Sequence, residues 1–245
     1  MTKPGDRSGP RDPYFLQMQA ALLAAGIATP TLVIDRARLN ANIDTLKGQL
    51  PAGMGYRIVA KSLPSLELIR HVRTRAATDR LMTFNQPMLL ALSTEMPEAD
   101  QLLGKPLPVQ AARRYFEQLP AGQSAAADKI QWLIDTPLRL DQYAELAAQT
   151  GRTLRLNIEL DVGLHRGGFE PGPELRQALE TIKSKPGLSF SGFMGYEPHI
   201  PSLPSALGWR DRALSGAWSS YRQCLELAAG IFGAGALAQI TRNAA

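Results

Sequence analysis

The stretch YRIVAKSLPS, residues 56–65, has the pattern that decides the fold. Its first half predicts a short buried strand that ends on Lys61, and Ser-Leu-Pro-Ser predicts a helix start directly after it. Because lysine is rarely buried without a partner, Lys61 has two interpretations. It is either the first solvated residue after the strand, or a nucleophilic amine that desolvation or a cationic neighbour prepares to form a Schiff base with a carbonyl.

The same order of strand and helix recurs along the chain. Strand-like runs end at Lys61, at Asn85, near Leu103, at Asp135, at Asp161, near Tyr196 and near Ile240. Helical patterns between them cover residues 66–75, 86–95, 109–118, 138–149, 174–183 and 209–229. Such repeats predict an α/β fold with a parallel sheet, and seven in a row favour a (β/α)8-type TIM barrel over a doubly wound sheet. No Gly-x-Gly-x-x-Gly opens a helix, which removes the main support for a dinucleotide site.

The chain divides into a leading segment and a barrel domain. Residues 1–28 are expected to form a lead and one helix, and residues 29–245 the barrel domain. The run TLVID, residues 31–35, predicts a short strand for which the sequence supplies no partner. A barrel of eight units takes about 250 residues. Since the repeats begin near residue 55, we expect a barrel that is incomplete at its C-terminus, with no β domain after it.

Composition excludes several classes of protein. No apolar run approaches the roughly 18 residues that span a bilayer, so no membrane partner is expected. The first dozen residues lack a signal-peptide core, which makes the cytoplasm the expected location. The net charge is +5, but the 27 basic residues are scattered, which fits a small anionic ligand better than nucleic acid. The single cysteine, Cys224, excludes an internal disulfide and is expected in the core.

One strand has a polar face. In LRLNIELDVG, residues 154–163, apolar and polar residues alternate strictly. In a barrel the apolar set faces the helices, and Asn157, Glu159 and Asp161 point into the lumen. Two carboxylates there require cations or a ligand. The alternative is an antiparallel strand with its polar face in water.

Two further polar segments follow at strand ends. GLHRGGF, residues 163–169, is a glycine-rich turn, and its Arg166 is close enough to pair with Glu159 or Asp161. The next strand runs into YEPH, in which Tyr196 and His199 could act as acid–base groups or stack on a planar cofactor. An ordinary loop is the alternative. The carboxyl ends of barrel strands are where barrel enzymes keep their active sites.

Three segments in this order resemble the alanine-racemase-type (fold type III) pyridoxal-phosphate family: residues 29–35, 59–62 and 159–169. The turn DVGLHRGG and the segment GYEPH are most similar to its D-threonine aldolase and D-serine dehydratase branch. The resemblance implies that Lys61 holds pyridoxal 5′-phosphate as a Schiff base and that Arg166 donates to the phenolic oxygen of the ring. It also implies that Tyr196 and His199 lie beside the ring. Alanine racemases have a lysine, able to carry a carbamate, at the position of Glu159, and we expect Glu159 to supply that negative charge directly.

The resemblance also implies the kind of reaction. It points to a lyase, an aldolase or dehydratase, that acts on a D-amino acid and forms a homodimer when full length. The family's phosphate-binding loop and C-terminal β domain, which supplies a second base or a divalent metal pair such as zinc or manganese, would follow this stretch. No metal ligand is therefore assigned here. The alternatives are an amino-acid racemase of the alanine racemase type, a non-enzymatic pyridoxal-phosphate carrier, and a cofactor-free Schiff-base aldolase, for which Lys61 lies too early.

Overall fold

The structure is a computed structural model that describes residues 12–204 and 207–244. The chain separates into two compact units, residues 1–45 and 46–245. The parallel sheet and every predicted site residue belong to the second unit. Among the described residues, none of the helices combines the length and the apolar composition needed to cross a membrane.

The first unit is built on two helices. Helix α1 (Pro13–Ala24) is capped by Asp12, whose carboxylate accepts the N–H of Tyr14 at 2.8 Å, and helix α2 (Arg36–Gln49) begins in this unit. The Tyr14 hydroxyl donates to Asp35 Oδ2 at 3.0 Å. The strand predicted over residues 31–35 is not formed: the segment is not assigned to any strand, and Leu32 is 96% exposed. A strand needs a neighbour for its backbone N–H and C=O groups, and the described residues provide none here.

The second unit is a curled sheet of seven parallel strands. These are β1 (Ile58–Val59), β2 (Arg80–Thr83), β3 (Asp100–Leu103), β4 (Ile130–Ile134), β5 (Leu154–Leu160), β6 (Leu188–Gly195) and β7 (Thr241–Asn243). They pair in chain order, each parallel to the next. The described part of the chain thus confirms the predicted incomplete (β/α)8-type TIM barrel, as a half-barrel.

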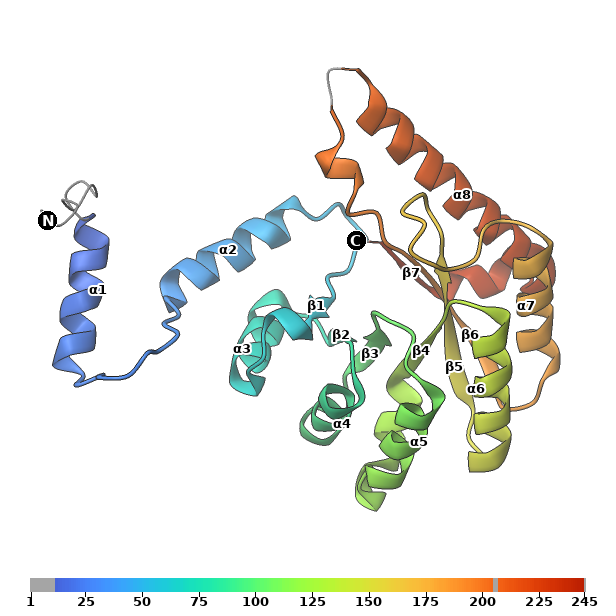
Figure 1. Cartoon of the computed structure of the whole chain (residues 1–245), viewed down its shortest axis with the longest axis horizontal. Helices are drawn as coiled ribbons and strands as arrows, with labels where there is room; N and C mark the ends of the chain where they lie inside the picture. The colour runs from blue at the N-terminus through green and yellow to red at the C-terminus, as the bar shows by residue number, and fades with distance from the viewer. Residues whose placement is uncertain (1–11, 205–206, 245) are drawn as a thin grey trace, which may run out of the picture. The chain divides into compact units, whose positions relative to one another are not determined.

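Six helices connect the strands and lie along the outer side of the curled sheet (Figure 1). They are α3 (Leu66–Ala76), α4 (Gln86–Glu95), α5 (Val109–Gln118), α6 (Pro137–Thr150), α7 (Pro173–Ser184) and α8 (Trp209–Phe232). Three start on polar caps placed just after a strand or strand-end turn: Ser65, Asn85 and Thr136 each accept a backbone N–H three residues on. The short 3₁₀ helices are η1 (Ala60–Ser62), η2 (Ala121–Lys129), η3 (Ile200–Ser202) and η4 (Ala234–Ala238).

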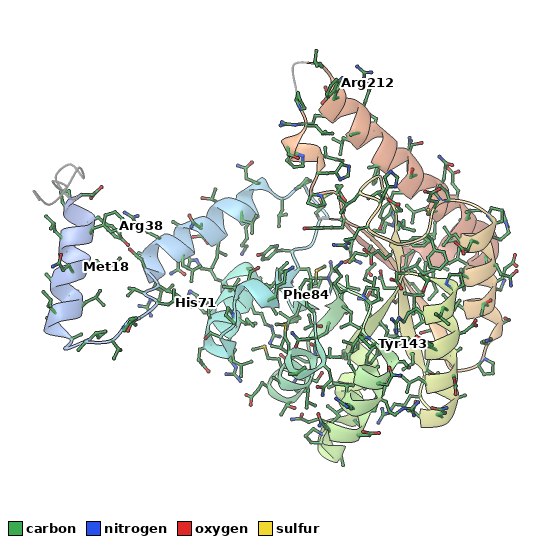
Figure 2. The ribbon with its side chains drawn as sticks, in the orientation of Figure 1. Met18, Arg38, His71, Phe84, Tyr143 and Arg212 are labelled. Atoms are coloured by element: carbon green, nitrogen blue, oxygen red, sulfur yellow. The ribbon has the colours of Figure 1, made fainter. Side chains whose placement is uncertain are left out.

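The face of the sheet toward the helices is apolar. Trp132 on β4 is fully buried, and its ring lies 5.8 Å from that of Tyr115 and 5.6 Å from that of Tyr143, both on helices. Tyr143, labelled in Figure 2, donates its hydroxyl to the carbonyl of Leu107 at 3.0 Å. Cys224 on α8 is buried as predicted, and burial raises the pKa of its thiol to about 12. This side of the sheet is therefore a packed core in the ordinary sense.

The concave face, or lumen, is polar instead. Hydrogen bonds of 2.7–3.3 Å link six side chains, here called the polar ring: Arg57, Asp100, Gln131, Asn157, Thr241 and Asn243. Its last link, from Arg57 Nε to Asn243 Oδ1, joins the residue before β1 to the end of β7. The two edge strands of a sheet can be joined through one side chain only when the sheet is curled, so the polar ring lies in the lumen. The sequence predicted this orientation for Asn157.

Candidate functional site

Lys61 lies at the carboxyl end of β1, within the 3₁₀ turn η1. The strand ends at Val59 and not at the lysine as predicted, because the chain turns there and the N–H of Leu63 bonds to the carbonyl of Ala60 at 3.0 Å. The residue is exposed, and its amine nitrogen lies 4.2 Å from the ring centroid of Phe84, the residue after β2. Lys61 is thus a solvent-accessible amine held against an aromatic ring.

Glu159, Arg166 and Tyr196 form one cluster. Glu159 on β5 is only 4% exposed, and its Oε1 accepts a hydrogen bond from Arg166 Nη2 at 2.5 Å. The guanidinium carbon of Arg166 lies 4.4 Å from the ring centroid of Tyr196, which follows β6. Of the two partners that the sequence allowed for Arg166, the structure selects Glu159. The buried carboxylate and the ring together fix the guanidinium as an oriented donor.

The turn that carries Arg166 is organised by Asp161. Its Oδ1 accepts the N–H groups of Gly163 and His165, at 2.9 and 3.1 Å, and its Oδ2 lies 2.9 Å from the His165 ring nitrogen. Partial burial by itself raises the pKa of the Asp161 carboxyl, but these hydrogen bonds outweigh it and hold the pKa below its ordinary value. A side chain at Gly168 would place its Cβ 2.8 Å from the carbonyl oxygen of Glu159, so glycine is required where the turn returns to β5.

His199 lies on the loop after β6. Its Nδ1 is buried and has no hydrogen-bond partner among the described residues. Its Nε2 would lie 3.7 Å from a Cβ placed on Gly163, which puts the imidazole beside the turn that carries Arg166. Buried polar atoms without partners are rare in native structures and call for an explanation, of which a bound group is one.

The predicted site residues therefore fall into two groups. Arg166, Glu159 and Tyr196 are in contact, and His199 lies against their turn. Lys61 contacts Phe84, and no hydrogen bond or ion pair within the described ranges joins Lys61 to the cluster. Sequence reasoning missed Phe84. The only sign of Phe84 in the sequence was an aromatic residue at the end of a predicted strand.

A second set of ligand atoms lies on the same turn. Asp161, His165 and Glu170 each offer one, all within 4.8 Å of one another. Asp161 and His165 are already engaged by the hydrogen bonds that shape the turn, which accounts for their closeness without a metal.

Fold and site together define a class of protein. It is a parallel (β/α) half-barrel with an exposed lysine after the first strand and a buried carboxylate–arginine pair at the mouth of the lumen. The chain belongs to the family described as alanine racemase, N-terminal domain, whose model matches residues 34–207. Enzymes of this fold family use pyridoxal phosphate.

Solved structures show the same fold at low sequence identity. The chain is similar to a D-threonine aldolase from Filomicrobium marinum, with 16% identity, a TM-score of 0.69, and coverage of 85% of this chain and 54% of that one. The alanine racemase of Clostridium difficile 630 has 15% identity and a TM-score of 0.65, with coverage of 84% of this chain and 51% of that one. A D-threo-3-hydroxyaspartate dehydratase has 17% identity and a TM-score of 0.65, with coverage of 88% of this chain and 56% of that one. The chain thus spans about half the length of these proteins. Comparison with curated protein sequences finds no match.

The donor set fits an anionic, planar aldehyde such as pyridoxal phosphate. It contains a solvent-accessible primary amine, a guanidinium held in one direction, a phenol ring and an imidazole whose buried Nδ1 has no partner in the described part of the chain. Lys61, which makes no ion pair within the described residues, is the cation that matches the negative charge of such a molecule.

Proposed function

We propose that this chain is the cofactor-binding barrel of a pyridoxal-phosphate-dependent lyase that acts on a D-amino acid. The observation that carries the proposal is the Glu159–Arg166 pair, since a buried carboxylate at 4% exposure holds a guanidinium in a fixed direction beside Tyr196. Such a pair costs desolvation free energy and is weak as a device for stability alone. A role in orienting a ligand explains it better.

Each residue has a defined task in this proposal. Lys61 Nζ would hold the aldehyde carbon of the cofactor, and its free amine would be the base for one face of the substrate Cα. Arg166, kept aligned by Glu159, would donate to the phenolic oxygen of the cofactor ring. Tyr196 and His199 would lie beside that ring. When bound, pyridoxal phosphate supplies the electron sink that stabilises negative charge at Cα.

Replacing the lysine tests the proposal directly. We expect full-length protein to show the visible absorbance of a lysine-bound cofactor and Lys61→Ala to lose it, because no other described lysine lies at the carboxyl end of β1. Lys129→Ala, which changes an exposed lysine before β4, is the matched control and should keep the absorbance. Absorbance unchanged in Lys61→Ala would overturn the role of Lys61.

The reaction is tested separately with D-threonine and D-serine. Release of glycine and an aldehyde indicates an aldolase, and release of pyruvate and ammonia a dehydratase. Interconversion of the enantiomers instead would identify a racemase. Bound cofactor with no product from either amino acid would favour a non-enzymatic carrier over the lyase.

A further inference from the structure

Phe84 occupies a space that a glycine leaves open. The ring follows β2 and is half-buried, and a Cβ added at Gly104, just after β3, would lie 2.5 Å from Phe84 Cε1. The same Cβ would lie 2.8 Å from Met82 Sδ, so Gly104 admits both side chains to one side of the sheet. The carboxyl ends of neighbouring parallel strands lie at the same edge of a sheet. Phe84, which follows β2, therefore lies at the same edge as Lys61, which follows β1 (Phe84 is labelled in Figure 2).

The contact between this ring and Lys61 has a physical effect on the amine. The face of an aromatic ring attracts an ammonium group, and the nitrogen here lies 4.2 Å from the centroid. The side chain of lysine is long and flexible and samples many rotamers when it is free. The Phe84 ring at the strand end favours those Lys61 rotamers that place the amine over the ring.

Two other cation–ring contacts lie in the described part of the second unit, and each differs from that of Lys61. The Arg166 guanidinium over Tyr196 is also held by the Glu159 carboxylate. Arg152 lies 5.4 Å from the Phe116 centroid, and that ring also packs against Trp132 in the helix-facing core. Phe84 instead lies at the strand edge, and within the described residues the Lys61 amine makes no hydrogen bond or ion pair beside its contact with this ring.

We propose that Phe84, seated by Gly104, is a positioning residue that holds the Lys61 amine at the mouth of the lumen before the cofactor arrives. This role rests on the proposed function of Lys61. Phe84 acts through the lysine, so its effect is on how readily the amine reacts.

The test measures the reactivity of Lys61 in the full chain without cofactor. Trace acetylation with acetic anhydride, read by peptide mass spectrometry, gives the rate for Lys61 relative to the exposed Lys129 in the same sample. The ring holds the amine and covers one side of it, so the reagent reaches the held amine less readily than a free one. We expect Phe84→Leu to raise the Lys61/Lys129 ratio about two- to fivefold.

Two further variants separate positioning from folding. Phe84→Tyr keeps the ring and should leave the ratio at the wild-type value. Gly104→Ala keeps Phe84 but displaces its ring, and should raise the ratio in the same direction as Phe84→Leu. Because Gly104→Ala retains the apolar side chain of Phe84, it provides the test if Phe84→Leu fails to fold.

An unchanged ratio in Gly104→Ala, or a rise in Phe84→Tyr as large as in Phe84→Leu, would overturn the proposal. The assay contains no cofactor, so its outcome is independent of the cofactor absorbance that tests Lys61. If the protein shows the predicted ratios but binds no pyridoxal phosphate, the proposed role of Phe84 stands and the proposed function is wrong.

Discussion

The two faces of the same sheet are built from different chemistry. Toward the helices, residues such as Trp132 and Ile158 are fully buried among apolar neighbours. Toward the lumen, the same strands β4 and β5 present Gln131, Asn157 and Glu159, which are also buried but hydrogen-bonded. Apolar packing tolerates several arrangements of similar energy, whereas a hydrogen-bonded network specifies distances and angles. The helix-facing side thus stabilises the sheet, and the lumen side sets where its polar groups point.

The largest expected effect is on the helix-facing side. Trp132→Ala should lower the free energy of unfolding by about 3–5 kcal/mol, because it leaves a cavity between β4 and the aromatic rings of α5 and α6. Urea unfolding of the full chain measures the loss. Trp209→Ala, at a tryptophan that is 49% exposed, is the control and should change stability by less than about 0.5 kcal/mol. Equal losses at the two positions would mean that Trp132 is not part of a packed core.

A smaller loss is expected in the lumen. The Arg57 side chain is only 9% exposed, and burial lowers the pKa of its guanidinium despite the opposing effect of Asp100 2.9 Å away. Asp100→Ala leaves that cation without its partner and should cost about 3 kcal/mol in the same assay.

A matched pair of variants shows whether charge or geometry matters in the polar ring. Asp100→Asn keeps an acceptor for Arg57 and should cost clearly less than Asp100→Ala. Arg57→Met combined with Asp100→Leu removes both charges and should recover much of the loss. If the double variant is no more stable than Asp100→Ala, the ring is held by its hydrogen bonds and not by the ion pair.

The smallest effect is at the mouth of the lumen and depends on pH. The folded pKa of Asp161 is depressed, so its contribution to stability is present above the unfolded value of about 3.9 and is lost as pH falls through the folded pKa. The stability difference between wild type and Asp161→Asn should therefore shrink as pH is lowered from 6 to about 3. Unfolding curves at several pH values measure it. Asp128→Asn, at an exposed aspartate before β4, is the surface control measured in parallel.

The sequence predicted those features that depend on local pattern. Strict alternation over residues 154–163 placed Asn157 and Glu159 in the lumen, and proximity along the chain brought Arg166 to Glu159. Helices α4 and α5 have their predicted bounds because Asn85 and the Pro108 turn set their starts and apolar periodicity sets their lengths. Each of these follows from residues a few positions apart.

Features that depend on distant residues were not predictable in this way. The polar ring joins residues up to 186 positions apart, and no periodicity in the sequence relates Arg57 to Asn243. The same limit applies to Phe84, since the space it occupies is created by Gly104 on the next strand. The strand expected over residues 31–35 was wrong for a related reason. Local β propensity is satisfied only when a partner strand is present.

The polar ring also sets an order of events during synthesis. Asp100 is synthesised 43 residues after Arg57. Asn243 is synthesised a further 143 residues later, since the two separations from Arg57 are 43 and 186. At a translation rate of about 5–20 residues per second, the interval is on the order of ten seconds. Asp100 is thus the partner that the chain offers Arg57 first, and the last strand supplies the residue that closes the ring.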